Sequence, residues 1–258
     1  IVAVPTTLAG ADVSQVAGAA ATPAGGFVEE TVTGGLSHPG LMPAAVVYDP
    51  DLVATTPADV LAASAMNGFD KGIETLYAST SLPVTDATAM RGLSVFREGL
   101  LAFGAGSRED WVFDALVRGV MLVQYGISRP DGGTLSLIHA FGHGLTAGYA
   151  VQQGAAHAVA APYVLEYIFE ETDGRRDLLA EALGVDEADD STGAVVEAVT
   201  EVRDALGLPT RLRDVDGPDP DAFEAVAQYI VDDPLAENLP PGLDPTIEDI
   251  EAVLEAAW

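Results

Sequence analysis

Most of the chain carries the hydrophobic pattern of amphipathic helices. From Thr56 onward, apolar residues recur every three or four positions, with polar residues between them. Thr56 is placed to cap a helix that starts at Pro57 and runs to about Ala78. The last helix is predicted to have Asp244 as its cap and Pro245 at its first position, with acids in its first turn. The other predicted helices span residues 84–104, 109–127, 134–148, 155–170, 173–183, 192–206 and 219–231, and the last spans 245–258.

The first 50 residues follow a different pattern. IVAVP (1–5) predicts a buried strand that leads into a Thr/Gly turn. FVEETVTGG (27–35) and AAVVYDP (44–50) carry β-branched residues bounded by Gly and Pro, which predicts further short strands. These strands are too few to form a sheet of their own. We therefore expect a mainly α protein, with a strand-rich remnant of a larger domain at 1–50 and an all-helical domain at 51–258. A sheet domain of that kind would normally supply cofactor binding, and the family resemblance described below implies that it binds a nucleotide.

The charge balance limits the partners. Forty Asp and Glu stand against 11 Lys and Arg, so the formal net charge is −29. Such a field repels nucleic acid and anionic membranes, and neither is an expected partner. The acids are spread along periodic helices, which predicts a folded protein with an acidic surface. A halophilic, high-salt cytoplasm would account for it, because salt shortens the range of self-repulsion. The acidic 186–190 stretch and the Pro-rich 234–245 stretch are predicted as surface loops.

Other classes of protein are excluded by what the sequence lacks. No apolar run reaches the length of a membrane span, and residues 1–20 have no positively charged start of a signal peptide. The absence of cysteine excludes disulfides, thiolate metal sites and a catalytic thiol. We expect a cytoplasmic protein with a small-molecule partner, and the sequence leaves a homodimer open.

Three of the four histidines gather in HAFGHGLTAGYAVQQGAAHAVAAP (139–162). His139 and His143 are four residues apart, so both project from one face of a helix, and His157 follows after a Gly-containing turn. Imidazoles at this spacing suit metal ligation or proton transfer. The alternative is a set of core histidines satisfied by backbone carbonyls, and the clustering favours a functional role.

The single lysine is the second unusual feature. Ten of the eleven cations are Arg, and Lys71 lies inside a predicted helix between MNGFD and GIETLY. It shares a helix face with Ser64 and Asn67. The alternative to a functional role is a structural ion pair with Asp70 or Glu74.

Four sequence blocks in order carry a family resemblance: PTTLAGADVS (5–14), VVYDPDL (46–52), SAMNGFDKGIETLY (64–77) and the histidine segment. With them the chain resembles the C-terminal two-thirds of the iron-containing (group III) alcohol dehydrogenase superfamily, and the maleylacetate reductase branch most of all. The likeness runs from end to end and includes LGLPTRLRDV (206–215) and the terminal helix. It implies the multi-helical, dehydroquinate synthase-like fold of that family's C-terminal domain.

The resemblance also implies an NAD(P)-dependent enzyme, with NAD or NADP in a cleft between a nucleotide-binding domain and the helical domain. Thr6, Thr7 and Gly10 match family positions that touch the dinucleotide. Hydroxyls and a glycine at a turn suit contacts with phosphate and ribose. The alternative is an ordinary turn between a strand and a loop.

At the family's metal site, this chain departs from the pattern. The four ligand positions, an Asp and three histidines in the alcohol dehydrogenases, hold Asn67, Lys71, His139 and Gln153 here. An amide is a poor substitute for a carboxylate, and an ammonium repels a cation. Only His139 remains a good ligand, so we expect a degenerate site without iron or zinc.

The likeness to the reductase branch assigns roles to the remaining residues. That branch resembles this sequence in having Asn at the Asn67 position, and His143 and His157 match its histidines. We expect His143 to donate a proton, with His139 and His157 orienting or stabilising the substrate. The ammonium of Lys71 would then lie where the metal's charge lies in the alcohol dehydrogenases, and it could bind a substrate carboxylate or offset charge on an oxygen.

Three functions stay open at this point. The first is a metal-independent NAD(P)H oxidoreductase that reduces a small carbonyl or unsaturated acid. The second is a metal-dependent alcohol dehydrogenase with a site rebuilt from other ligands. The third is a non-enzymatic or incomplete helical scaffold that lacks a cofactor domain. The clustered histidines favour the first, because a packing role would be met by apolar residues at lower cost.

Overall fold

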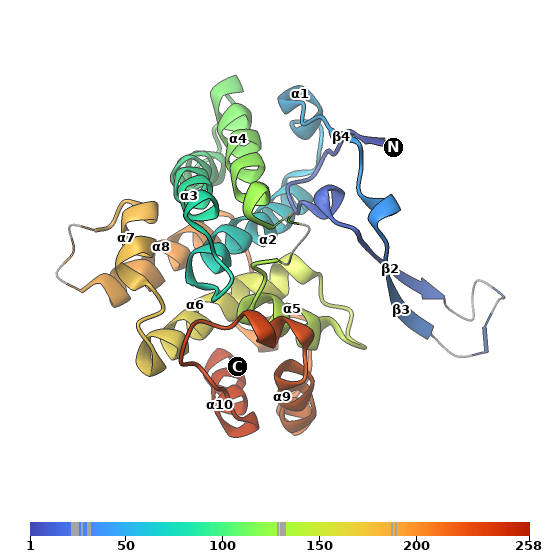
Figure 1. Ribbon diagram of the computed structural model, residues 1–258, viewed down its shortest axis with the longest axis vertical. Helices are drawn as coiled ribbons and strands as arrows, with labels where there is room; N and C mark the ends of the chain where they lie inside the picture. The colour runs from blue at the N-terminus through green and yellow to red at the C-terminus, as the bar shows by residue number, and fades with distance from the viewer. Residues whose placement is uncertain are drawn as a thin grey trace.

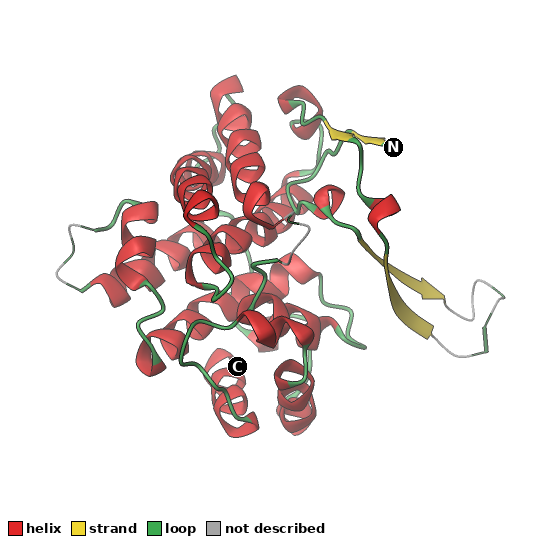
Figure 2. Cartoon of the chain, in the orientation of Figure 1, coloured by secondary structure: helices red, strands yellow, loops and turns green. Residues whose placement is uncertain are grey.

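The computed structural model describes residues 1–21, 26, 28–29, 32–127, 129, 133–186, 188 and 190–258. Helices build the body of the molecule, and the strands lie along one edge of it (Figures 1 and 2). The mainly α prediction is confirmed.

The long helices fall close to the positions that the hydrophobic period predicted. The prediction at 219–231 is divided, because residues 220–222 form a 3₁₀ turn before the helix begins. Residues 234–238, predicted as loop, also form a 3₁₀ helix, η6. The helices are α1 (Pro50–Val53), α2 (Ala58–Tyr77), α3 (Pro83–Gly104), α4 (Asp110–Ile127), α5 (Leu137–Thr146), α6 (Gln153–Glu171), α7 (Arg176–Leu183), α8 (Ser191–Ala205), α9 (Phe223–Val231) and α10 (Ile247–Ala257).

Helix α2 is at the centre of this arrangement. It packs against α3, α4, α6 and α7, and its side chains are buried almost continuously from Leu61 to Tyr77. Two glycines allow its neighbours to come close. A Cβ on Gly68 would lie 2.2 Å from the carbonyl oxygen of Leu8, and one on Gly72 would lie 2.7 Å from Leu93. The turn after β1 is therefore seated directly on α2.

The strands form two separate pairs. β1 (Val2–Ala3) runs parallel to β4 (Ala45–Val46), and β2 (Val16–Ala21) runs antiparallel to β3 (Val32–Ser37), with Val16 opposite Ser37. The expectation that the strands form no sheet of their own is therefore wrong, although each sheet has only two strands. β2 had no counterpart in the prediction.

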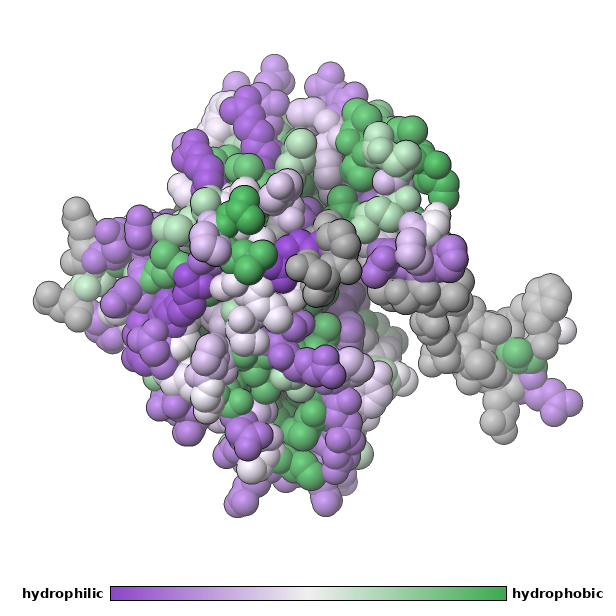
Figure 3. Space-filling view, in the orientation of Figure 1, coloured by the Kyte–Doolittle hydropathy of each residue, from purple (hydrophilic) through white to green (hydrophobic). Residues whose placement is uncertain are grey.

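The first strand is exposed rather than buried. Ile1, Val2 and Val4 have 82, 62 and 49% of their surface accessible, and Val47 beside β4 has 50%. The prediction of a buried strand is therefore wrong. An apolar sequence does not show whether another part of the structure covers the strand. Figure 3 shows hydrophobic side chains gathered at the upper right, over this strand pair and α1.

Two of the predicted helix caps are also wrong. The hydroxyl of Thr56 donates to the carbonyl oxygen of Thr6, and α2 begins at Ala58 without a side-chain cap. Helix α10 is capped by Thr246, whose hydroxyl accepts from the N–H of Asp249 while the Asp249 carboxylate accepts from the N–H of Thr246. This reciprocal pair satisfies two N–H groups at once, so the helix starts later than Pro245.

Parts of other predictions fall outside the described residues. Residues 27, 30 and 31 of the predicted strand at 27–35 are among them, as are 187 and 189 of the acidic loop. Within the described part of the chain, no helix is long and apolar enough to cross a membrane.

Candidate functional site

A cavity of about 810 Å³ brings together most of the residues that the sequence singled out. It lies between the turn after β1, the side of α2 that carries Asn67 and Lys71, helix α5 and the η6 segment (Pro234–Asn238). The predicted site residues that line it are Gly10, Asn67, Lys71, His139, His143 and Gln153. Thr6, Thr7 and His157 are not among its lining residues.

Lys71 enters this pocket from the centre of α2. It is 7% exposed, and its Nζ donates to the carbonyl oxygen of Ala9 at 2.6 Å. Burial lowers the pKa of Lys71 to about 8, although the carboxylates of Asp12 and Glu74 oppose that shift. Among the described residues, it forms no ion pair with Asp70 or Glu74, each of which faces a histidine instead. Because its pKa of about 8 lies above neutral pH, Lys71 carries its charge at the wall of the pocket.

His143 is the histidine that is open to the pocket. Its side chain is 42% exposed, and its Nδ1 lies 2.8 Å from Oδ2 of Asp233. The hydrogen bond from Asp233 raises the pKa of His143, and partial burial opposes it. Burial also raises the pKa of Asp233, but the hydrogen bonds from His143 and from the Leu235 N–H outweigh it and leave that pKa below its ordinary value.

The other two histidines face buried carboxyl groups behind the pocket wall. His139 Nδ1 lies 2.5 Å from Oε2 of Glu74, and His157 Nδ1 lies 3.3 Å from Oδ2 of Asp70. The two imidazole rings pack edge to face with centroids 4.3 Å apart. Neither close contact has the alignment of a hydrogen bond. We name these four residues the buried acid–histidine cluster.

Burial controls the charge of this cluster. It raises the pKa of Asp70 and raises that of Glu74 to about 7, against hydrogen bonds that lower it. It lowers the pKa of His139 and lowers that of His157 to about 3. Both histidines are therefore neutral, and the carboxyl groups hold their protons to higher pH than usual. A neutral cluster is what an apolar interior favours.

Glycines make room for this arrangement on α5 and α6. A Cβ on Gly142 would lie 2.2 Å from Nε2 of His157. A Cβ on Gly154 would lie 1.9 Å from the carbonyl oxygen of Ala63. The second contact holds the start of α6 against α2, which places Gln153 at the pocket and His157 in the cluster.

Sequence reasoning missed three acids of the site. Asp70 and Glu74 were considered only as partners of Lys71. They lie four residues apart and are flanked in the sequence by the apolar residues Phe69, Ile73 and Leu76, a pattern that indicates buried acids with specific partners. Asp233 is 90 residues from His143 in the chain, and no sequence pattern connects the two.

The turn after β1 offers a partial fit to a dinucleotide. Gly10 has a left-handed backbone with φ of 71° and lines the pocket beside Ala9. This backbone conformation favours glycine, and a Cβ there would also lie 2.1 Å from the amide nitrogen of Gln124. Thr6 is exposed and Thr7 is half-buried, away from the pocket lining.

The residues at the implied metal positions do not fit a metal ion. Lys71 places an ammonium among them, and both ring nitrogens of His139 are buried, with Nδ1 against Glu74. Asn67 and Gln153 offer only amide groups. No group of three or more His, Asp or Glu in the described part of the chain is arranged to hold a metal.

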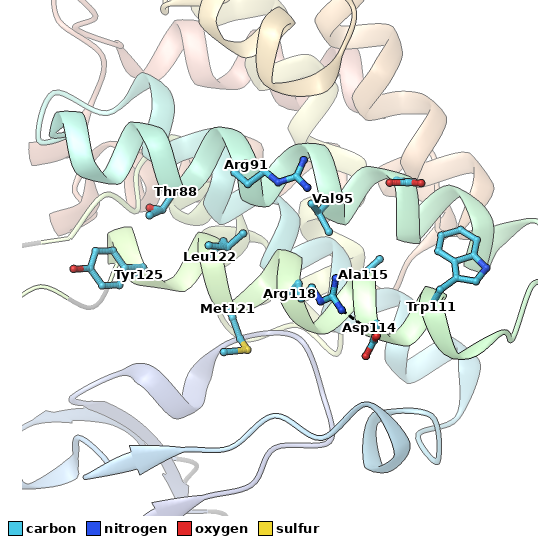
Figure 4. A pocket seen from close by; sticks show the side chains of 11 residues that line it. Thr88, Arg91, Val95, Trp111, Asp114, Ala115, Arg118, Met121, Leu122 and Tyr125 are labelled. Atoms are coloured by element: carbon cyan, nitrogen blue, oxygen red, sulfur yellow. Dashed lines mark hydrogen bonds and ion pairs between the residues drawn. The ribbon is translucent and has the colours of Figure 1, made fainter.

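A second cavity, of about 660 Å³, lies between α3 and α4. Figure 4 shows the lining residues: Thr88, Arg91 and Val95 are on α3, and Trp111 and Met121 are among those on α4. Its charged lining residues include the exposed pair Arg118 and Asp114, whose side chains are 3.2 Å apart. It contains no histidine, so the first cavity is the better candidate for proton transfer.

Fold and site together define a multi-helical domain with a pocket, beside its strand-bearing edge, that is lined by Lys71, His139 and His143. The family model described as "Fe-containing alcohol dehydrogenase family, C-terminal" matches residues 61–258. The chain belongs to this family.

Individual relatives agree with that assignment. Lactaldehyde reductase of Escherichia coli (strain K12) is 26% identical over 221 residues, which cover 84% of this chain and 56% of the relative. Maleylacetate reductase of Rhizobium sp. (strain MTP-10005) is 28% identical over 172 residues, covering 65% and 44%. The chain thus spans about half the length of the curated relatives it matches. The solved alcohol dehydrogenase from Oenococcus oeni has the same fold, with a TM-score of 0.85 at 22% identity, covering 100% of this chain and 65% of that one.

The first prediction concerns the proton on Glu74. Its pKa is raised from 4.5 to about 7, so this carboxyl stabilises the fold below pH 4.5 and loses that contribution as the pH rises through 7. Glu74→Gln is neutral at every pH. Its stability relative to the wild type should therefore rise between pH 5 and pH 8, on the order of 2 kcal/mol. Urea unfolding at pH 5, 6.5 and 8 measures it, with the exposed Glu98→Gln as the matched control. A difference that does not change with pH would contradict the protonated carboxyl.

The second prediction is that metal is dispensable for the fold. After dialysis against a chelator, the purified protein should keep its melting temperature and contain no stoichiometric iron, zinc or nickel by elemental analysis. The ammonium of Lys71 lies among the implied ligands and repels a divalent cation. One equivalent of tightly held metal would contradict this reading of Asn67, Lys71 and Gln153.

Proposed function

We propose that the chain is the substrate-binding and proton-donating part of a metal-independent NAD(P)H oxidoreductase that reduces a small carbonyl or unsaturated acid. The observation that carries the proposal is the pairing in one pocket of a buried ammonium, Lys71, with an accessible imidazole, His143. The first supplies positive charge for an anion, and the second supplies a proton.

Lys71 binds the acid group of the substrate, or the oxygen on which negative charge develops. The surface field of a chain with net charge −29 repels anions, so an anionic substrate needs a fixed local cation. The ammonium is held by the Ala9 carbonyl and lies in a region of low dielectric, where its attraction for an anion is stronger than in water.

His143 donates the proton that completes the reduction. Its raised pKa keeps a larger fraction of the ring protonated near neutral pH. His139 forms part of the pocket wall as a neutral ring, and His157 orients His139 through their edge-to-face contact. The roles expected for the three histidines thus differ: one donates a proton, one lines the wall and one supports it.

The cofactor part of the proposal rests on Thr6, Thr7 and Gly10, with NAD or NADP supplying a hydride when bound. Gly10 lines the pocket, although the space that a side chain would take there is filled by the amide of Gln124. The exposed apolar β1–β4 pair supports the assignment of residues 1–50 to a nucleotide-binding part, because parallel strands are usually covered on both faces. Among the relatives are an NAD-dependent methanol dehydrogenase and a sulfoacetaldehyde reductase in complex with NAD⁺.

The other two hypotheses have less support. No alternative ligand set for a metal-dependent enzyme is found among the described residues. A purely structural role does not account for the buried ammonium of Lys71 beside an open cavity, because burying a charge without a bound anion costs free energy. A cytoplasmic location, a homodimer and the reductase branch remain predictions.

The third prediction concerns Lys71. Lys71→Met should weaken the binding of maleate, a small dicarboxylate probe, by roughly tenfold or more, because the cation at the pocket wall is lost. Lys71→Arg keeps the charge and should retain part of the binding. In an enzyme reconstituted with its nucleotide-binding part, Lys71→Met should lower turnover roughly a hundredfold. Calorimetry and thermal melting measure both effects.

Arg118→Met is the matched control, because it removes one exposed cation that does not line this pocket. It should leave maleate binding unchanged. If Lys71→Met lowers the melting temperature but leaves binding and turnover intact, Lys71 is structural.

The fourth prediction is that this chain by itself binds NADH and NADPH weakly or not at all. Its 258 residues contain no Gly-rich strand–turn–helix phosphate site with a following acid for the ribose. Titration calorimetry with both dinucleotides measures it. Micromolar affinity would show that residues 1–258 carry the cofactor site, contrary to the division of roles proposed above.

A further inference from the structure

We propose that Asp233 is a positioning residue that fixes the tautomer and the orientation of the His143 imidazole, so that Nε2 is the nitrogen left for the substrate. This inference rests on the proposed role of His143 as proton donor. It assigns to Asp233 a role that neither the sequence pattern nor the family likeness indicated.

The carboxylate of Asp233 is itself held in place. Its side chain is 5% exposed, and its two oxygens have separate partners. Oδ1 accepts from the backbone N–H of Leu235 at 2.9 Å, and Oδ2 faces His143 Nδ1 at 2.8 Å. A carboxylate that already accepts a backbone bond has little freedom to rotate. It therefore sets the direction of the ring that it contacts.

The segment that carries Asp233 is fixed to the helix that carries His143. Asn238, at the far end of η6, donates from Nδ2 to the carbonyl oxygen of Leu135 at 2.8 Å. Its own carbonyl oxygen accepts from the hydroxyl of Ser136 at 3.2 Å. Leu135 and Ser136 directly precede α5, so the wall formed by η6 and the proton donor on α5 keep one relative position.

An ionised carboxylate accepts hydrogen bonds and cannot donate one, so the contact requires a proton on Nδ1. Neutral His143 then has its lone pair on Nε2, and protonated His143 carries its second proton there. In either state the nitrogen that exchanges a proton with a substrate is Nε2. The 42% exposure of the side chain leaves the ring accessible from the pocket.

The charged groups around His143 come from several elements. Asp233 is in direct contact. Lys71 on α2 and the ring of His139 line the same pocket, while Glu74 and the ring of His157 lie behind its wall. Asp233 raises the pKa of His143 by its hydrogen bond and its charge, and Glu74 adds a smaller effect in the same direction. Because His139 and His157 are neutral, they have little effect on the pKa of His143.

The test compares Asp233→Asn with Asp232→Asn in the full chain. Asp232 is exposed, bonds to Gln228 at 2.7 Å and has no contact with His143, so its substitution makes the same change of charge one residue away. Imidazole ¹⁵N spectra recorded across a pH titration report the tautomer and the pKa of each ring. The spectrum of His143→Gln identifies the His143 signals by their loss.

In Asp233→Asn, the amide oxygen can still accept from Leu235, and the amide nitrogen can donate to Nδ1. The neutral tautomer should then change from Nδ1–H to Nε2–H, and the pKa of His143 should fall by about one unit. Asp232→Asn should change neither quantity. An unchanged tautomer and pKa in folded Asp233→Asn would overturn the proposal.

The wild type provides a test that does not depend on the variant folding. At high pH, its His143 should show the Nδ1–H tautomer, and a majority of Nε2–H would overturn the proposal. Neither measurement uses a substrate or a cofactor. If no reduction is ever observed but the Nδ1–H tautomer is found, the proposed function fails while the positioning by Asp233 stands.

Discussion

The burial of α2 is the constraint on which the rest of the site depends. This helix is surrounded by other elements, yet it carries Asn67, Asp70, Lys71 and Glu74 within two turns. An isolated charge in such a position would cost several kcal/mol, so each of these groups needs a partner, a proton or a cavity. The placement of α5, α6 and the turn after β1 meets that need, and in doing so it creates the pocket.

The partners divide α2 into two sides with different chemistry. On the pocket side, Lys71 keeps its charge through the Ala9 carbonyl and the nearby carboxylates. On the inner side, Asp70 and Glu74 hold neutral histidines against them. The cluster therefore lies behind the pocket, while Lys71 and His143 are ionisable groups that line the pocket itself. The ammonium supplies positive charge from the protein at positions where the family resemblance implies metal ligands.

Much of the fold could be predicted from the sequence, because the hydrophobic period of a helix is a local property. The long helices from α2 to α10 lie near their predicted positions, and the pairing of Asn67 with Lys71 on one helix face followed from their spacing. The caps at Thr56 and Asp244 were predicted wrongly, because several side chains near a helix start compete for the same N–H groups. The exposure of β1 could not be predicted from the local sequence either, because it depends on whether another part of the structure covers the strand.

The sequence by itself singled out the candidate residues: a lone lysine and three clustered histidines in an acidic chain. Only the tertiary structure decided which of them reach the pocket. His143 and His157 have similar local surroundings in the sequence, yet one is 42% exposed and the other is fully buried. The acidic partner of His143, Asp233, is 90 residues away in the sequence, and that of His157, Asp70, lies on a different helix. Accessibility and charge state depend on groups brought together by packing, and a pattern of neighbouring residues contains no record of such distant contacts.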